Sequence, residues 1–290
     1  MRVHIVCYEQ PPSWILGKIA HKLCNTLKTL SIDSTISDQP DFNADVNHHI
    51  YYLPFKGHKT KIDTLLVTHI DKQEKLRILL GQLAVADGAI FFSEQTRNML
   101  QIAGAPTNKL TVINPPQDEV IKPRKMRVGI LTNIYPNYRK REDLIYDLVS
   151  SVNLSGFEFI IMGTGWENLA QILEQKEIEY TWHPRFEYEE YTKVVPQLDY
   201  FLYTGLDEGS MAFLDILAAD VKTIITPQGF HLDADIPIDH PFETADELKN
   251  TFQQITKTRR LRPNAVAMWT WKNYAASHIA FWRSIINQKV

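Results

Sequence analysis

Cysteine, surplus charge and long apolar runs are all scarce in this sequence. The 290 residues include two cysteines, Cys7 and Cys24, which argues against a disulfide framework and favours a cytoplasmic protein. The 31 Lys and Arg residues face 34 Asp and Glu residues, for a formal net charge of -3, so we do not expect nucleic acid as a partner. No run approaches the ~18 apolar residues of a membrane-spanning helix, and the first residues predict a strand, not a signal peptide.

Metal-binding patterns are missing as well. His48 and His49 are adjacent, so on a strand their side chains point to opposite faces. No His-x-x-x-His pair with a nearby acid is present. We therefore expect no metal site and no cofactor.

Short apolar runs alternate with helix-like patterns along most of the chain, which is typical of parallel sheets with right-handed crossovers. The alternation stops at Asn114-Pro115-Pro116 and restarts with Met126–Leu131. A proline-rich break predicts a linker, and the length suits two cores better than one. We therefore predict an α/β protein with two Rossmann-like parallel-sheet domains facing a cleft. The first comprises residues 1–120, the second comprises 121–265, and an aromatic helix over 266–290 crosses back to the first.

The expected elements follow from the same periodicities. Strands are expected at 3–8, 49–53, 64–68, 89–92, 110–113, 126–131, 157–162, 180–183, 200–203 and 221–226. Helices are expected, among others, at 71–86, 93–104, 139–152, 187–195, 244–255 and 265–286.

Three carboxylates surround the predicted start of one helix in YTGLDEGSMAFLDILAAD, residues 203–220. The helix start offers unpaired N–H groups and the positive end of its dipole, so an anion such as phosphate fits there. Asp215, one turn on, could reach a ribose hydroxyl, and Asp207 or Glu208 could meet a sugar attached to the phosphates. The alternative is that Asp207 and Glu208 only cap the helix. The backbone groups expected at the phosphates belong to Gly209, Ser210, Met211 and Ala212.

Three basic residues, Arg139-Lys140-Arg141, form the start of another predicted helix. Cations at a helix start oppose the helix dipole, which favours anions there. The arrangement makes sense if Arg139 and Lys140 point at a bound diphosphate. The alternative is a solvated turn.

The segment DEGSMAFLDILAADVKTIITPQG resembles the retaining glycosyltransferases of the GT-B fold, family 4 in particular, which carry a Glu-x7-Glu motif here. Seven residues separate Asp207 from Asp215, whereas a match of Glu208 to the first acid would leave the spacing one shorter. Both Asp207 and Glu208 therefore stay candidates for the carboxylate that faces the donor sugar. The second acid is Asp instead of Glu, and Asp220-Val-Lys replaces the usual Gly-x-Pro.

Further segments resemble the same family in the same order. In DTLLVTHIDKQEK, His69 matches the histidine that faces the donor sugar and the acceptor, although a lone strand-end histidine is more often a core residue. In GILTNIYPNYRKREDLI, Thr132 or Asn133 stands where the family has Arg, so the resemblance assigns the diphosphate to Arg139 and Lys140. ADGAIFFSEQTRNMLQIAGAPTNKLTVINPPQD is the longest match and is mostly structural.

The resemblance also assigns the remaining site residues. Gly163 and Gly165 of FIIMGTGW would shape the donor pocket. In EYTWHPRFEYEEY, the candidates for holding the base are Trp182, His183 and Arg185, with simple packing as the alternative. Trp14 and Gly17 of QPPSWILGKIAHKL take the place of the family's acceptor loop, where Trp14 either offers a stacking face for a sugar or belongs to the core.

What the resemblance implies is a metal-independent glycosyltransferase that moves a hexose, with retention, from a nucleoside diphosphate sugar such as a UDP-sugar. The acceptor would be a hydroxyl on a glycan or a lipid-linked sugar. The lean first domain suggests an acceptor surface that is open, or completed by a membrane or a partner protein. The loop with Lys56, His58, Lys59 and Lys61 could meet an anionic surface, such as the inner face of a membrane, or could simply be solvated. The main alternative is a catalytically silent GT-B protein that binds nucleotide or glycan, and an epimerase or a phosphorylase fits less well.

Overall fold

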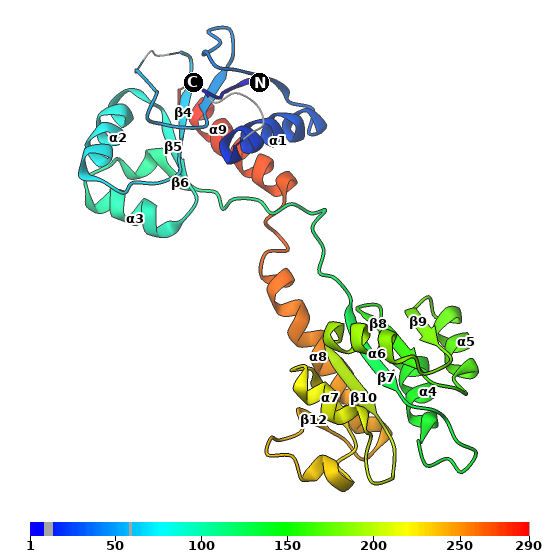
Figure 1. Cartoon of the computed structure of the whole chain (residues 1–290). Helices are drawn as coiled ribbons and strands as arrows, with labels where there is room; N and C mark the ends of the chain where they lie inside the picture. The colour runs from blue at the N-terminus through cyan, green and yellow to red at the C-terminus, as the bar shows by residue number, and fades with distance from the viewer. Residues whose placement is uncertain (9–13, 58–59, 290) are drawn as a thin grey trace. The chain divides into compact units, whose positions relative to one another are not determined.

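The chain forms two compact units in the computed structural model, which describes residues 1–8, 14–57 and 60–289. Unit 1 consists of Met1–Ile121 together with Asn264–Val290, and unit 2 is the continuous stretch Lys122–Pro263. These bounds lie close to those expected from the sequence. The chain passes between the units twice (Figure 1).

Unit 1 is built on a six-stranded parallel sheet with the strand order β2-β1-β3-β4-β5-β6. Its strands are β1 Arg2–Val6, β2 Asp33–Ser37, β3 Val46–His49, β4 Asp63–Val67, β5 Gly88–Phe91 and β6 Leu110–Val112. Its helices are α1 Ile15–Thr29, α2 Gln73–Val85, α3 Glu94–Ile102, the short 3₁₀ turn η1 Thr107–Lys109, and α9 Trp271–Lys289.

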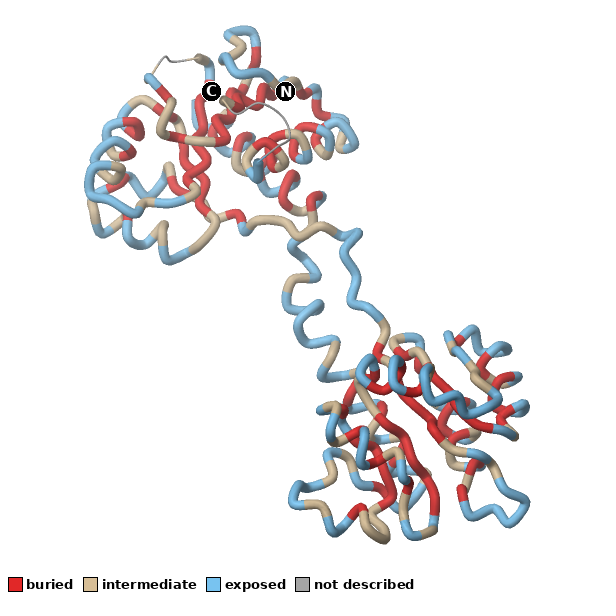
Figure 2. The backbone as a smooth tube through the Cα atoms, viewed as in Figure 1, coloured by how far each residue is buried: buried red, intermediate tan, exposed pale blue. Residues whose placement is uncertain are grey.

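Helices cover both faces of this sheet. The apolar residues of α1 repeat every four positions at Ile19, Leu23 and Leu27, and all three are buried in one core with α9. On the other face, Leu79 and Leu83 of α2 pack in a second core with α3. Strands β3, β4 and β5 are buried along their whole length (Figure 2).

Helix α9 belongs to unit 1 although it follows unit 2 in the sequence, as predicted from its aromatic residues. Trp282 is fully buried, and its indole Nε1 donates a hydrogen bond to Thr64 Oγ1 on β4 at 3.1 Å. Trp271 and Tyr274 are buried in the same core.

Unit 2 carries a second six-stranded parallel sheet, in the order β12-β11-β10-β7-β8-β9. Its strands are β7 Met126–Leu131, β8 Phe157–Met162, β9 Glu179–His183, β10 Tyr200–Tyr203, β11 Lys222–Ile225 and β12 His240–Pro241. Its helices are α4 Glu142–Ser151, α5 Glu167–Gln175, α6 Tyr188–Val194, α7 Ala212–Ala218 and α8 Ala245–Ala265, with 3₁₀ turns η2 Val195–Gln197 and η3 Gly229–Leu232. The predicted class, α/β with two Rossmann-like parallel-sheet domains, is confirmed.

Each sheet has one point where the strand order reverses. In unit 2 the chain runs outward from β7 to β9 and then returns to the other side of β7 with β10. In unit 1 the reversal lies between β1 and β3, because β2 is on the far side of β1. Loops on either side of such a point leave in opposite directions and open a crevice at the carboxyl ends of the strands, where ligands bind in this class of fold.

Several sequence expectations about the bounds of elements are wrong, including that of the helix predicted at 139–152, which begins at Glu142. The strand placed at 49–53 ends at His49 and begins at Val46. The helix expected to stop near Ile255 continues to Ala265, because the polar run after Ile255 is rich in Lys and Arg, which are good helix formers. The last helix begins at Trp271 instead of 265, so Trp269 lies outside it.

No helix among residues 1–8, 14–57 and 60–289 is both long and apolar enough to span a membrane.

Trp282→Ala should lower the free energy of unfolding of unit 1 by about 3–5 kcal/mol, because it leaves a large cavity beneath α9 and removes the partner of Thr64 Oγ1. Urea denaturation of the full chain, followed by circular dichroism, would measure the effect. Arg283→Ala, at the exposed neighbouring position, is the matched control and should leave the transition unchanged. Equal midpoints for the two variants would contradict the docking of α9.

Candidate functional site

A cavity of about 780 Å³ lies at the strand-order reversal of unit 2. Its walls come from the loop after β7, the turn after β8, the start of α6, the turn after β10 and the first turns of α7. Of the predicted site residues, the cavity wall includes Arg139, Lys140, Gly163, Asp207, Glu208, Gly209, Ser210, Met211, Ala212 and Asp215. Sequence segments about 80 residues apart therefore meet in one place.

Lys140 and Asp207 form the central contact of this cavity. The Lys140 ammonium is buried and lies 2.6 Å from Asp207 Oδ2 and 2.5 Å from the hydroxyl oxygen of Tyr203. The Tyr203 hydroxyl donates in turn to Asp207 Oδ1. Arg139 adds a weaker contact, with its Nε 3.8 Å from Asp207 Oδ2. The basic turn and the acidic turn, which the sequence analysis treated separately, are thus one ion-paired unit.

The protonation states of this group follow from its surroundings. Burial alone would raise the pKa of Asp207, but the hydrogen bonds from Lys140 and Tyr203 and the charge of Lys140 outweigh it and hold the pKa below its usual range. Burial and the neighbouring carboxylate raise the pKa of Tyr203 well above its usual range. At neutral pH the group therefore contains an ionised Asp207 and a neutral Tyr203.

The backbone of the basic turn is held in an unusual conformation. Tyr138 and Arg141 have φ values of 54° and 45°, in the left-handed region that few residues other than glycine adopt. Arg141 compensates by donating from Nε to the Thr204 carbonyl at 2.7 Å and from its guanidinium to the Glu243 carbonyl at 3.0 Å. Thr204 Oγ1 donates to the Lys140 carbonyl. Arg141 is therefore a framework residue, while the Arg139 guanidinium lies 4.1 Å from the Tyr135 ring centroid and lines the cavity.

The predicted amide cradle is already partly occupied by the protein itself. Gly209 N donates to Asp207 Oδ1 at 3.3 Å, and Ser210 N donates to His231 Nε2 at 2.8 Å. Helix α7 has only seven residues and begins at Ala212, whereas the sequence predicts a start near Gly209 or Ser210. A phosphate could use the Gly209 and Ser210 N–H groups only by displacing these partners.

His231 is a support of this turn that sequence reasoning missed. Its side chain is buried, and its Nδ1 lies 3.4 Å from the Thr226 carbonyl. Because Ser210 N donates to Nε2, that nitrogen must be unprotonated, and Nδ1 carries the proton. Burial lowers the pKa of His231, although the hydrogen bond to Thr226 opposes this effect.

The turn after β8 is locked to the loop after β7. Gly163 has a φ of 138°, and a Cβ there would lie 2.2 Å from the Thr132 carbonyl oxygen, so only glycine fits. The Trp166 indole donates to the same carbonyl at 2.7 Å, and Thr164 N donates to Asn133 Oδ1 at 2.8 Å. Thr132 and Asn133 therefore brace the wall where the resembling family has an arginine.

The segment predicted to hold a base contributes different residues from those chosen. Trp182, His183 and Arg185 do not line the cavity, and the Trp182 indole is used in a hydrogen bond to the Gly163 carbonyl at 2.9 Å. The aromatic wall comes instead from residues slightly further along, Phe186, Tyr188 and Tyr191. The same quoted segment contained them, and the aromatic spacing at the start of α6 was the available signal.

Asp215 is held by the aromatic wall. The Tyr191 hydroxyl donates to Asp215 Oδ2 at 2.6 Å, while Asp215 itself is exposed on α7. Burial and the bond to Asp215 raise the pKa of Tyr191, so the hydroxyl is a donor at neutral pH. This fixes the carboxylate at the edge of the cavity. Gly165 does not line the cavity, because it packs close to Ile134.

The remaining predicted residues lie in unit 1. His69 follows β4 and is 48% exposed, with its Nε2 2.9 Å from Lys75 Nζ and its Nδ1 2.9 Å from Thr68 Oγ1. Trp14 precedes α1 and is 65% exposed. Gly17 is buried inside α1, so it contributes packing and not an acceptor loop. The predicted loop around Lys56–Lys61 lies partly outside the described residues, since 58–59 are not among them, and so do residues 9–13 before Trp14.

Within the part of the chain that the structure describes, no group of three or more His, Cys, Asp or Glu side chains is arranged to hold a metal ion.

No protein-family model matches the chain, and no curated protein matches its sequence. Solved structures with a remotely similar fold include Anabaena HepE, described in complex with UDP and glucose, at 11% identity and a TM-score of 0.37, with 99% of both chains covered. The lipopolysaccharide outer core galactosyltransferase WaaB matches at 12% identity and 0.39, with 100% of both chains covered. A sucrose-phosphate synthase from Thermosynechococcus elongatus matches at 10% identity and 0.40, with 99% of both chains covered.

The depressed pKa of His231 predicts an acid-labile unit 2. The folded state keeps the imidazole neutral, whereas the unfolded chain takes up a proton below pH ~6.5, so stability should fall as the pH drops from about 7 toward 5. Urea midpoints measured across this range should show a shallower pH dependence for His231→Gln than for the unmodified chain. His69→Gln, an exposed histidine of unit 1, is the control and should keep the original slope; an unchanged slope for His231→Gln would refute the assignment.

Proposed function

We propose that the chain is a GT-B glycosyltransferase whose unit 2 binds the donor, a nucleoside diphosphate sugar, with UDP-hexose as the leading candidate. The observation that carries the proposal is the division of one cavity into a cationic part, with Arg139 and Lys140, and an aromatic part, with Phe186 and Tyr188. A ligand that suits both has negative charge at one end and a flat ring at the other. A nucleoside diphosphate has this chemistry.

The aromatic part suits the nucleoside. Phe186 and Tyr188 are 64% and 69% exposed, which is unusual for large aromatic side chains in a cavity wall and leaves ring faces free for stacking. Asp215, oriented by Tyr191, can accept hydrogen bonds from ribose hydroxyls. This keeps the predicted role of Asp215 and transfers the base-binding role to the aromatic wall.

The cationic part suits the diphosphate. Transfer of the sugar builds negative charge on the departing diphosphate, and preorganised cations stabilise that charge most where water is excluded. Lys140 and Arg139 provide two cations at the carboxyl ends of the strands, with the N–H groups of Met211 and Ala212 as further candidates. The proposal therefore needs no metal ion for this step.

Asp207 and Glu208, which lie between the cationic and the aromatic part of the cavity wall, have different roles in this proposal. The Asp207 carboxylate is engaged by Lys140 and Tyr203, so it acts first as an anchor of the cation. Glu208 is exposed and lines the cavity, and within the described residues its carboxylate has no hydrogen-bond partner. We therefore assign the contact with donor-sugar hydroxyls to Glu208. His69 and Trp14 of unit 1 keep their predicted roles on the acceptor side, the acceptor being a glycan or lipid-linked sugar, and retention is proposed from the sequence resemblance alone.

The alternative is a catalytically silent protein that binds the nucleotide or a glycan. It is favoured by one observation: Thr132 and Asn133 hold the turn at Gly163 where the resembling family has an arginine.

The binding part of the proposal is testable by calorimetric titration of the full chain with UDP and with uridine. UDP should bind more tightly than uridine, and Arg139→Gln and Lys140→Gln should each weaken UDP by roughly 10- to 100-fold, the loss of one charge-assisted hydrogen bond. Uridine should bind all variants alike. Lys193→Gln removes an exposed lysine of α6 outside the cavity and serves as the charge-matched control. Equal affinities for UDP and uridine would rule out the diphosphate site.

The catalytic part is testable with UDP-glucose in the absence of an acceptor. An active enzyme should release UDP slowly, since water can replace the acceptor, and Glu208→Gln should reduce this release while UDP binding persists. A chain that binds UDP tightly and releases none from UDP-glucose, even with added oligosaccharides, would support the silent alternative.

A further inference from the structure

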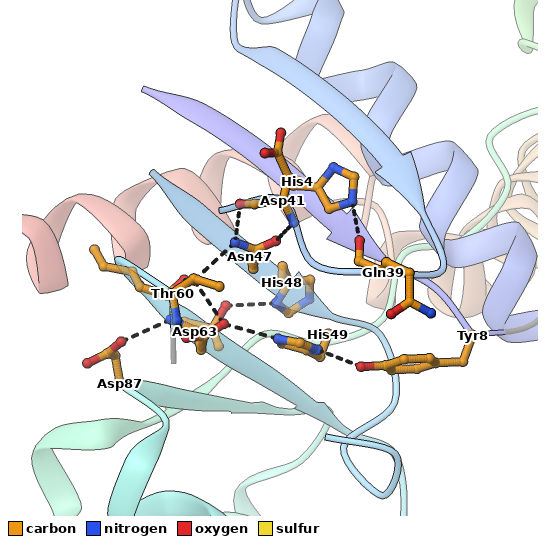
Figure 3. A network of polar contacts seen from close by, with 12 residues as sticks. His4, Tyr8, Gln39, Asp41, Asn47, His48, His49, Thr60, Asp63 and Asp87 are labelled. Carbon is orange, nitrogen blue, oxygen red and sulfur yellow. Dashed lines mark hydrogen bonds and ion pairs between the residues drawn. The ribbon is translucent and has the colours of Figure 1, made fainter. Parts of the chain in front are cut away.

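A chain of hydrogen bonds links three side chains on one face of the unit 1 sheet (Figure 3). The Tyr8 hydroxyl lies 3.2 Å from His49 Nδ1, and His49 Nε2 lies 3.2 Å from Asp63 Oδ1. His49 and Asp63 are almost completely buried, with side-chain exposures of 1% and 0%, whereas Tyr8 is partly exposed. The hydrogen bonds therefore connect a side chain that a ligand can reach, Tyr8, to a buried carboxylate, that of Asp63.

Asp63 determines which atom donates in each of these hydrogen bonds. An ionised carboxylate only accepts hydrogen bonds, and Asp63 accepts from Thr60 N at 2.7 Å and from Thr60 Oγ1 at 3.0 Å in addition to His49. His49 Nε2 must then carry a proton, and in the neutral ring Nδ1 is an acceptor. The Tyr8 hydroxyl consequently donates to Nδ1, which leaves its oxygen lone pairs available to a ligand.

The position of the chain of hydrogen bonds in the fold points to a ligand. Tyr8 lies two residues beyond the end of β1, and His49 is the last residue of β3. The strand order of unit 1 reverses between these two strands, so Tyr8 lies at the point where this class of fold binds ligands.

His48, next to His49 in the sequence, is an example of a buried histidine with a structural role alone. His48 is equally buried but points to the opposite face, where it packs against the rings of His278 and Trp282 and bonds to Thr64 Oγ1. It has no carboxylate partner among the described residues. A buried His–Asp pair is costly unless fully satisfied, and such groups at a ligand-binding edge are candidates for proton transfer.

We propose that Tyr8, His49 and Asp63 form a proton relay that activates a hydroxyl-bearing acceptor bound by unit 1. The inference rests on the proposed glycosyltransferase function. As the acceptor oxygen forms its bond to the anomeric carbon, its proton passes to the Tyr8 oxygen, and the Tyr8 proton passes to His49 Nδ1. The bond from the anomeric carbon to the diphosphate oxygen breaks, and that oxygen keeps the electron pair. The proton rests on the imidazolium, stabilised by Asp63, and returns to solvent through Tyr8 after the product leaves.

Tyr8 is the residue that touches the acceptor in this scheme, and His49 and Asp63 act through it. Burial and the charge of Asp63 raise the pKa of Tyr8, so it remains a neutral donor before the reaction. The other titratable groups near His49 are His4 and His48, whose own pKa values are lowered chiefly by burial, so both are neutral at pH 7. Asp63 is therefore the charged group that contacts the His49 ring, through Nε2.

The relay is tested in the full chain with UDP-glucose as donor and water as acceptor. Tyr8→Phe removes only the hydroxyl and should lower kcat by about 10²-fold or more, the usual contribution of general base catalysis, with KM for UDP-glucose and the affinity for UDP unchanged. Tyr274→Phe removes another buried hydroxyl of unit 1, one without a hydrogen-bond partner among the described residues, and is the matched control that should keep the full rate.

A second variant separates a relay from mere packing. Asp63→Asn preserves the shape, but its amide can donate to Nε2, so the ring proton moves to Nδ1, which then cannot accept from Tyr8. Its kcat should fall as in Tyr8→Phe, the double variant should lose no more than either single one, and histidine ¹⁵N spectra should show the exchanged tautomer. A rate within about threefold of the unmodified chain for Tyr8→Phe, or additive losses in the double variant, would overturn the relay while leaving UDP binding by unit 2 intact. Failure of the proposed function would instead appear as equal affinities for UDP and uridine in the unmodified chain.

Discussion

The Lys140–Asp207 ion pair is the contact on which the shape of the unit 2 cavity depends. It joins the loop after β7 to the turn after β10 across the strand-order reversal, and Tyr203 satisfies both partners. The Lys140 side chain is buried whereas Asp207 is partly exposed, so the loss of Asp207 would leave a buried cation without its counter-charge. Asp207 also accepts from Gly209 N, so the same carboxylate orients the start of the acidic turn. The cavity is thus preformed, with its principal cation already neutralised by the protein, and an incoming anion must compete with Asp207 for Lys140.

In both units, polar side chains gather where the strand order of the parallel sheet reverses, at the carboxyl ends of the strands. At the reversal in unit 2 the groups are charged, with Arg139, Lys140 and Asp207 around a cavity. At the reversal in unit 1 the partly exposed group is the neutral hydroxyl of Tyr8, and the charged group, Asp63, is buried behind His49. Electrostatic attraction would suit a charged donor in the first case, and hydrogen bonding would suit an uncharged acceptor in the second. The two sheets therefore differ in chemistry far more than in architecture.

The sequence predicted most strands because inner strands such as β4, β5 and β10 are largely apolar. The inner strand β3, VNHH, was misplaced and the edge strand β2, DSTIS, was missed, because neither carries that signal. Lys140 and Asp207 could be predicted to lie near each other because each belongs to a short local motif at the end of a strand, and both line the cavity. Tyr203 and His231 were missed as site residues because their roles arise from packing between elements: His231 meets Ser210 from 21 positions away. The sequence did not distinguish Trp182 from Phe186 as a cavity residue, since a shift of a few residues after the end of β9 decides which of the two rings lines the cavity.

The placement of α9 has a consequence for how the chain is made. Ribosomal synthesis delivers unit 2 as one uninterrupted stretch, and that unit can fold as soon as Pro263 has emerged. Unit 1 is begun first but waits for Trp282 and its neighbours to cover the sheet face that carries His48. Until then that apolar face is open on the nascent polypeptide, so the unit that is begun first is completed last.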